Sequence, residues 1–203
     1  MSLTLEEKFE RMKEIRDELL QLKNSPLYQY RIDNKYFPVV GEGSHTAHIM
    51  FIGEAPGKNE AETGRPFSGK SGKVLDNMLE SIRLNRSDVY ITNIVKDRPQ
   101  ENRDPTDEEI KIYAPFLDRQ IEIIQPQVIA TLGRFSMAYI MNRFGLTDKI
   151  GTIGELHGKE FVAQTNYGPI SVIPLYHPAV SLYDGSNKET ILKDFQVLTK
   201  YIK

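Results

Sequence analysis

Short apolar segments alternate with longer amphipathic segments along most of this sequence. The apolar segments 48–53, 88–95, 127–132 and 170–175 each have the length of a single strand. The stretches between them carry apolar residues at helical spacing. A chain that alternates strands and helices in this way folds as a mostly parallel sheet covered by helices. We therefore expect an α/β fold, a three-layer α/β/α sandwich with a mostly parallel central sheet.

Amphipathic helices are expected on both faces of this sheet. Their ranges are 4–22, 70–83, 106–124 and 135–145, followed by a last helix that begins at Ser186. Capping boxes, in which Thr or Ser is followed three residues later by Glu, begin the helices at Thr4, Thr106 and Ser186. Residues 160–163 read as a strand antiparallel to 170–175. No linker or repeat divides the chain, so residues 1–203 are expected to form one domain.

Composition excludes several classes of protein. Hydrophobic residues make up 39% and charged residues 27%, which is the balance of a globular chain and not of a disordered one. No apolar run approaches the roughly 18 residues of a membrane helix, and the charged N-terminus is no signal peptide. We therefore expect a cytoplasmic protein without membrane contact. With 26 basic and 28 acidic residues, any nucleic-acid site must be a local patch.

The absence of cysteine restricts the chemistry further. The chain has no Cys, which excludes disulfides, thiol nucleophiles and thiolate-held metal centres. His45 and His48 lie three residues apart, but no further ligand completes a metal set with them. His157 has no companion and is expected to be structural. We therefore expect no metal site.

Polar side chains stand where three of the predicted parallel strands end. These are Glu54, Asn93 and His177, the last followed by a proline. Because ligands bind beyond the carboxyl ends of strands in open α/β sheets, we expect the three to converge there. A carboxylate at the mouth of a buried strand is costly unless it is solvated, paired or used. Structural roles remain open for two of them, with Asn93 as a strand-end cap and His177 as a satisfied core histidine.

Residues 64–71, GRPFSGKS, match the phosphate-loop pattern of nucleotide-binding proteins. That pattern should follow a strand directly, yet residues 58–63 intervene here. No predicted strand ends in the aspartate that would hold magnesium. Nucleotide binding is therefore a minor alternative, which magnesium-dependent ATP binding would support.

The segments GEAPG, GRPFSGKSG, ITNIVKDRPQENRDPTDEE, PFLDRQI and HPAVSL occur in this order. Together they resemble the family 4 uracil-DNA glycosylases of the uracil-DNA glycosylase superfamily. The segments SPLYQYR and VVGEG extend the resemblance over nearly the whole chain. The resemblance implies a monomeric DNA base-excision repair enzyme that hydrolyses the N-glycosidic bond of uracil, or of a related deaminated base, in DNA. The alternative is a catalytically inactive DNA- or nucleobase-binding protein on the same fold.

The resemblance also implies roles for the strand-end residues. Glu54 would position the attacking water or stabilise the cationic sugar. His177 would donate a hydrogen bond to uracil O2, where negative charge develops as the bond breaks. Asn93 would read the edge of the flipped base, since its amide matches uracil O4 and N3–H.

Four further residues complete the implied base pocket. Phe67 would stack on the uracil ring, and Glu60 would occupy the space that a thymine methyl group needs. The backbone of Gly53 and Ala55 would supply amide contacts. Each side chain also has a simpler interpretation, in which Phe67 packs in the core and Glu60 is solvated.

Basic residues near these motifs are candidates for DNA contact. Arg65, Lys70 and Lys73 lie in a stretch without acids, where they could bind phosphates. Leu182 or Tyr183 could insert into the base stack from the loop after His177. A second basic group follows the second strand and could extend the stripe; it consists of Lys96, Arg98 and Arg103. Solvated surface charge is the alternative for both groups.

One departure from the resembling family is large. That family usually holds a four-iron four-sulfur cluster on four cysteines. The motif alignment places Leu22, Ser25, Asp97 and Tyr113 at those positions. None of them supplies a thiolate, so we expect no cofactor. Packing by residues such as Leu22 and Tyr113 would then substitute for the cluster.

Overall fold

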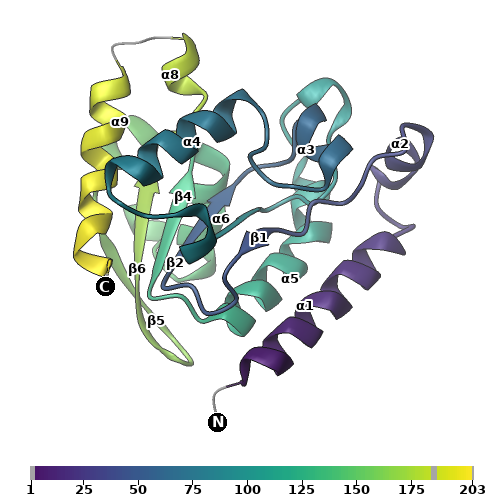
Figure 1. The fold of residues 1–203 in the computed structure, drawn as a ribbon, viewed down its shortest axis with the longest axis horizontal. Coiled ribbons are helices and arrows are strands. Elements are labelled where there is room, and N and C mark those ends of the chain that lie inside the picture. The colour runs from purple at the N-terminus through teal and green to yellow at the C-terminus, as the bar shows by residue number, and fades with distance from the viewer. Residues whose placement is uncertain (1–2, 184–186, 203) are drawn as a thin grey trace.

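A six-stranded mixed sheet forms the centre of the protein (Figure 1). The computed structural model describes residues 3–183 and 187–202. The strands are β1 (Glu42–Gly43), β2 (Ile49–Gly53), β3 (Tyr90–Asn93), β4 (Val128–Leu132), β5 (Phe161–Thr165) and β6 (Gly168–Leu175). Their spatial order is β1-β3-β2-β4-β6-β5. The four central strands are parallel and the two edge strands antiparallel, which confirms the predicted α/β fold.

Helices cover both faces of this sheet (Figure 1). They are α1 (Leu5–Leu20), α2 (Tyr28–Asp33), α3 (Lys58–Thr63), α4 (Lys70–Ser81), α5 (Asp107–Ile124), α6 (Arg134–Arg143), α7 (Ile153–Leu156), α8 (Val180–Tyr183) and α9 (Asn187–Gln196). The capping boxes at Thr4 and Thr106 are present as predicted. The predicted cap at Ser186 lies outside the described residues. Sequence periodicity missed β1, α2, α3, α7 and α8, because elements this short hold too few residues to show a repeat.

Two apolar layers lie against the sheet, one on each face. Alternate residues of β2 point to opposite faces, as the pleat of a strand requires. Ile49 and Phe51 pack with apolar residues of α4 and α9. Met50 and Ile52 pack with residues of α5 and α6, and α1 lies against α5. All four β2 side chains are buried, which explains why this strand is a continuous apolar run.

The strand register brings the carboxyl ends of the parallel strands to one edge. Gly53 of β2 is paired with Asn93 of β3, and Leu132 of β4 with Leu175 of β6. The residues that follow β2 and β6, Glu54 and His177, therefore emerge at the same edge as Asn93. Among the described residues, no helix is both long and apolar enough to cross a membrane.

Candidate active site

A cavity of about 470 Å³ opens at this edge of the sheet. Its walls include Glu54 after β2, Asn93 at the end of β3 and His177 after β6. The predicted convergence of these three side chains is therefore confirmed. Ala55, Glu60 and Phe67 line the same cavity, together with Pro56, Gly57, Ser71, Pro99, Asn102, Arg103, Asp104 and Ala179.

Gly53 lies directly behind the cavity wall. A Cβ atom at this position would stand 2.3 Å from Asn93 Oδ1 and 2.8 Å from Phe67 Cζ. Both distances are far shorter than a van der Waals contact, so any side chain at Gly53 would displace the two residues. Glycine is therefore required for Asn93 and Phe67 to approach the same strand end.

Phe67 occupies an unusual backbone conformation. Its φ is 48°, in the left-handed region that a non-glycine residue seldom adopts. The side chain is buried at 5% exposure, and its ring centroid lies 5.7 Å from that of His177. Phe67 belongs to the apolar layer under α4 and also lines the cavity, so it packs in the core, while its stacking on a base stays a prediction.

His177 presents a defined tautomer to the cavity. The backbone N–H of Ala179 donates to His177 Nδ1 at 3.2 Å, so Nδ1 is the acceptor nitrogen. In the neutral ring the proton is then carried by Nε2. Burial lowers the pKa of His177, an effect that the nearby Glu60 carboxylate partly opposes. At neutral pH the ring is therefore an uncharged donor through Nε2.

Glu54 is half-buried at the mouth of β2. Burial raises its pKa to about 7, and the neighbouring Asp104 carboxylate adds to that rise. The Arg134 guanidinium acts in the opposite direction. Asp104 and Arg134 themselves form an exposed ion pair at 2.5 Å. Glu54 is therefore a carboxyl group that changes charge near neutral pH, as groups that handle protons in active sites often do.

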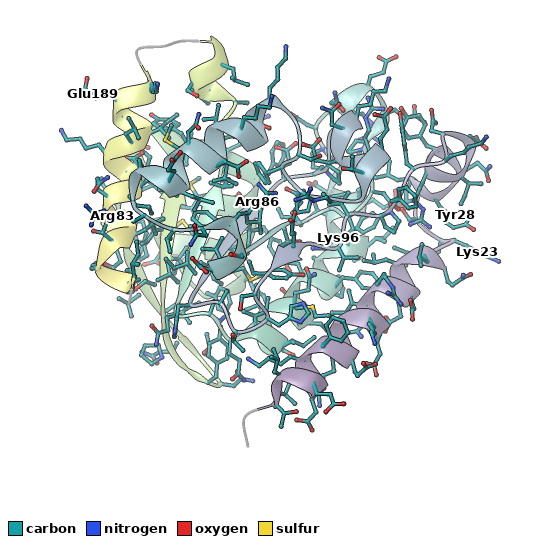
Figure 2. All side chains as sticks on the ribbon, in the orientation of Figure 1. Lys23, Tyr28, Arg83, Arg86, Lys96 and Glu189 are labelled. Atoms are coloured by element: carbon teal, nitrogen blue, oxygen red, sulfur yellow. The ribbon has the colours of Figure 1, made fainter. Side chains whose placement is uncertain are left out.

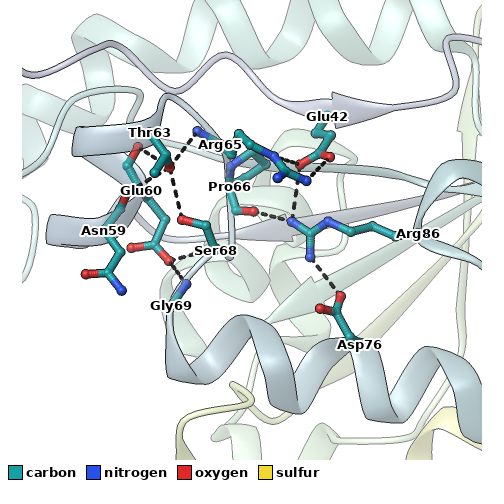
Figure 3. Close-up of polar contacts among 10 residues, drawn as sticks. All are labelled: Glu42, Asn59, Glu60, Thr63, Arg65, Pro66, Ser68, Gly69, Asp76 and Arg86. Atoms are coloured by element: carbon teal, nitrogen blue, oxygen red, sulfur yellow. Dashed lines mark hydrogen bonds and ion pairs between the residues drawn. The ribbon is translucent and has the colours of Figure 1, made fainter.

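Glu60 is not solvated but accepts hydrogen bonds from backbone amides at the start of α4. Its Oε1 accepts hydrogen bonds from the backbone N–H groups of Ser68 and Gly69, both at 2.9 Å (Figure 3). The side chain is only 8% exposed. These amides are the ones that a phosphate loop would direct at its ligand. Since a carboxylate already occupies them, the loop does not fit a nucleotide phosphate.

The sequence comparisons agree with this geometry. A family model described as "Uracil DNA glycosylase superfamily" matches residues 40–199 of the chain. That range contains every side chain of the cavity. The chain belongs to the uracil-DNA glycosylase superfamily.

Relatives within this superfamily narrow the assignment. The chain is 43% identical to the type-4 uracil-DNA glycosylase of Sulfurisphaera tokodaii over 91% of its own length and 82% of the relative. It is 44% identical to that of Saccharolobus solfataricus over 90% and 82%. It is 41% identical to that of Archaeoglobus fulgidus over 92% and 91%. The chain is thus a member of the type-4 uracil-DNA glycosylase family, as its motifs predicted.

The first predicted basic group consists of Arg65, Lys70 and Lys73, and one of these residues is engaged in an ion pair. Arg65 forms a bidentate ion pair with Glu42, which also lies 3.5 Å from Arg86 (Figure 3). Lys70 and Lys73 are exposed on the first turns of α4. Neither lysine has a carboxylate within ion-pair distance among the described residues. The two lysines therefore remain the stronger candidates for phosphate contact.

The second predicted basic group is wrong as a surface stripe. Lys96 is completely buried, and Figure 2 shows it inside the ribbon, while Lys23 projects at the periphery. Its ammonium donates to Thr92 Oγ1 at 2.7 Å, to the Asn93 carbonyl at 2.6 Å and to Gln120 Oε1 at 2.6 Å. Burial without a carboxylate partner lowers the pKa of Lys96 well below its usual value. The segment directly after β3 is buried, and the ammonium of Lys96 there binds the backbone carbonyl of Asn93.

The remaining members of that group are also engaged. Arg103 lines the cavity but is paired with Glu109 at 2.5 Å. Arg98 donates to the hydroxyls of Tyr30 and Tyr36 at 3.1 and 2.9 Å. Both guanidinium groups therefore bind side chains of the protein itself. The sequence did not reveal these partners.

The predicted base-stack wedge lies on a helical turn instead of a loop. Leu182 is in α8 and is 47% exposed, so its side chain is accessible. The side chain of Tyr183 lies outside what the structure describes. Leu182 therefore remains a prediction for DNA contact.

Sequence reasoning missed most of one wall of the cavity. Pro99, Asn102 and Asp104 come from the polar segment between β3 and α5, in which only Arg103 was named as a candidate, for phosphate contact. Ser71 and Ala179 were also not singled out. Proximity to the motifs around Asn93 and His177 was the only available signal, because irregular polar segments carry no periodicity that places their side chains.

The four cluster positions of the resembling family do not fit an iron–sulfur cluster in this chain. Leu22 has no donor atom, and Ser25, Asp97 and Tyr113 supply only oxygen. Tyr113 bonds to both Ser25 and Asp97 at 2.6 Å, and Asp97 is also paired with the Arg31 guanidinium. Clusters of this kind require thiolates, and these side chains are already bonded to one another.

Proposed function

We propose that this chain hydrolyses the N-glycosidic bond between uracil and deoxyribose in DNA, with Glu54, Asn93 and His177 at the reacting centre. The observation that supports it most strongly is their convergence in one cavity, with His177 held as a neutral Nε2–H donor. This proposal places the protein in DNA base-excision repair. We infer that it acts as a monomer, since one chain supplies the whole cavity.

Recognition of the base would use shape and hydrogen bonds together. A base must leave the duplex stack before its glycosidic bond can be reached. Phe67 would stack on the flipped ring, and the Asn93 amide would pair with uracil O4 and N3–H. Cytosine presents the opposite pattern of donors and acceptors at these atoms, so a fixed amide would reject it. Glu60, held by Ser68 and Gly69, would exclude a thymine methyl group.

Cleavage produces an anionic base and a cationic sugar, and both need stabilisation. His177 Nε2–H would donate to uracil O2 as negative charge develops there. A neutral donor suits this role, because its hydrogen bond gains strength as O2 becomes charged. The ionised Glu54 would stabilise the positive sugar or orient the attacking water. The amides of Gly53 and Ala55 would complete the contacts at the strand end.

The DNA itself would be held outside the cavity. Lys70 and Lys73 would contact phosphates, with a contribution from Arg65 that the Glu42 ion pair reduces. Leu182 would replace the extruded base in the stack. Such contacts position the DNA without reading its sequence, so binding should weaken as the salt concentration rises.

Substitution of His177 separates an enzyme from a binding protein. Loss of one oxyanion donor typically lowers the rate about a hundred- to a thousandfold, while phosphate contacts are untouched. His177→Ala should therefore bind a uracil-containing oligonucleotide nearly as well as wild type but release uracil far more slowly. Abasic-site formation in the presence of EDTA, at saturating protein, measures the rate.

His48→Ala is the matched control, because His48 is exposed at the opposite end of β2. It should keep wild-type excision. If neither the wild type nor the control releases uracil while both bind the oligonucleotide, the protein is a binding module. If His177→Ala loses affinity but keeps its rate in saturated complexes, His177 is a DNA contact and the mechanism is wrong.

A further inference from the structure

A chain of directed hydrogen bonds runs through the protein at the positions of the missing cysteines. The backbone N–H of Leu27 donates to Ser25 Oγ at 3.1 Å. Tyr113 donates its only hydroxyl proton to Asp97 Oδ2 at 2.6 Å, so Ser25 must donate to the Tyr113 oxygen, also at 2.6 Å. Ser25, Asp97 and Tyr113 are exposed by 5%, 1% and 0%. The chain ends on a carboxylate that water cannot reach.

Arg31 supplies the charge that balances this carboxylate. Its Nη1 lies 3.2 and 3.1 Å from the two oxygens of Asp97. The guanidinium also donates to the carbonyls of Leu19 at 2.8 Å and Leu20 at 2.9 Å. These carbonyls belong to the last turn of α1, whose acceptors have no partner within the helix and whose dipole attracts a cation. At 3% exposure, Arg31 is thus a buried cation with acceptors at both terminal nitrogens.

The four residues connect segments that are distant in the sequence. Ser25 and Arg31 belong to the α1–α2 region, Tyr113 to α5, and Asp97 to the segment that follows β3. The next residue in that segment, Arg98, is held by two tyrosines of the α2 region and donates to Asn102 Oδ1 at 2.8 Å. Asn102 lines the cavity. The contacts therefore lead from α1 and α2 to the cavity wall at 99–104.

We propose that Ser25, Arg31, Asp97 and Tyr113 form a buried clamp that holds the segment 94–104 against α1 and α2. None of the four clamp residues lines the cavity, so they are positioning residues. They act through Arg98 and Asn102 on one wall of the cavity. The existence of the clamp is independent of the proposed function, whereas its effect on uracil excision rests on it.

A double-mutant cycle tests the clamp through stability. Removing one partner of a buried ion pair leaves an uncompensated charge, whereas replacing both by apolar residues is often nearly neutral. Arg31→Met and Asp97→Leu should each lower Tm by on the order of 10 °C. The double variant should recover most of that loss.

The exposed pair of Arg119 and Glu18 is the control, with side chains 37% and 50% accessible. Arg119→Met should change Tm by no more than about 4 °C, because exposed ion pairs contribute little. Equal losses for Arg31→Met and Arg119→Met would overturn the clamp. A double variant whose loss in Tm equals the sum of the two single losses would also overturn the clamp.

Amide hydrogen exchange tests whether the clamp acts locally. Tyr113→Phe keeps the ring but removes both hydroxyl bonds. Under native conditions, exchange should accelerate in residues 94–104 and 22–34 and stay unchanged in β4 and β6. Ile173→Val, which thins the core of β6, should instead accelerate exchange in the central strands. Uniform acceleration in Tyr113→Phe would overturn the proposal.

Uracil excision by Tyr113→Phe provides the link to function. We expect a severalfold lower rate that accompanies the local exchange. If wild type does not excise uracil at all, the exchange result still decides the clamp, so the two proposals fail separately. Wild-type excision in a variant whose 94–104 segment has loosened would overturn the positioning role.

Discussion

Burial shifts the pKa values of two ionisable groups of the cavity, His177 and Glu54, toward their proposed tasks. It lowers the pKa of His177, which keeps the imidazole neutral, and raises that of Glu54 to about 7. Both shifts have the same cause, since the low-polarity surroundings disfavour whichever form is charged. The result is an uncharged hydrogen-bond donor beside a carboxyl group that ionises near neutral pH.

The rate of uracil excision should therefore depend on pH through Glu54. If the carboxylate is the active form, the rate falls about tenfold for each pH unit below 7 and is level above it. A single-turnover pH profile measures this dependence. Glu54→Gln should lower the rate and flatten the profile. A wild-type profile that is flat from pH 5 to 8 would exclude Glu54 from the chemical step.

The same shift predicts a gain in stability for that variant. Glu54 binds its proton more tightly in the folded than in the unfolded chain, so folding stability falls as pH rises from about 4.5 to 7. Glu54→Gln removes this penalty. The variant should unfold at higher urea concentration than wild type at pH 8, and the difference should vanish near pH 4. A variant that is less stable than wild type at pH 8 would contradict the raised pKa.

Contacts at the start of helix α4 contribute both to the stability of the fold and to the proposed recognition of the base. The helix begins at Lys70 without an N-cap side chain of its own, since its cap is Gly69. Glu60 of α3 supplies the missing acceptor through Ser68 and Gly69. Gly72, one turn into α4, has no room for a Cβ atom, which would lie 1.7 Å from the Phe67 carbonyl oxygen. Helix and loop thereby fix the position of Phe67.

Glu60→Ala should consequently affect two measurable properties. Loss of a helix cap costs about 1 kcal/mol, which lowers Tm by roughly 2–4 °C in a chain of this size. The vacated space should also admit thymine, detected as weak excision from a thymine-containing oligonucleotide. Glu62→Ala is the control, because Glu62 is exposed on the same helix α3. Equal stability of Glu60→Ala and wild type would contradict the capping role.

Across the whole molecule, the two apolar layers and the buried polar contacts stabilise the fold. The sheet is packed on both faces, and the clamp joins α1 and α2 to the segment after β3. The potential cluster ligands contain no sulfur. We therefore expect no folding step that depends on an iron–sulfur cluster, in contrast to chains whose metal contributes directly to their stability.

Chelation should accordingly leave this protein unchanged. Protein purified in air should be colourless and contain less than stoichiometric iron by elemental analysis. Prolonged treatment with EDTA should alter neither Tm nor the rate of uracil excision. A Tm that falls on chelation and returns with added iron would show that the alignment of the four ligand positions is wrong.

Local patterns in the sequence were enough to predict the architecture and the centre of the cavity. Alternating apolar runs and capping boxes act locally, so they specified the central strands and the long helices. Because parallel strands end at one edge, Glu54, Asn93 and His177 had to meet there. The lack of cysteine likewise excluded thiolate ligands without any coordinates.

The contacts of the individual polar side chains, in contrast, depend on packing between segments that are distant in the sequence. Packing places Lys96 in the interior, where its ammonium donates to the Asn93 carbonyl. It directs the Glu60 carboxylate of α3 to the amides at the start of α4, and it sets the Nε2–H tautomer of His177. It also brought Arg31 to Asp97, 66 positions later in the chain. Such pairs form because a charge removed from water requires a partner, and packing decides which partner is within reach. No local pattern in the sequence encodes that choice.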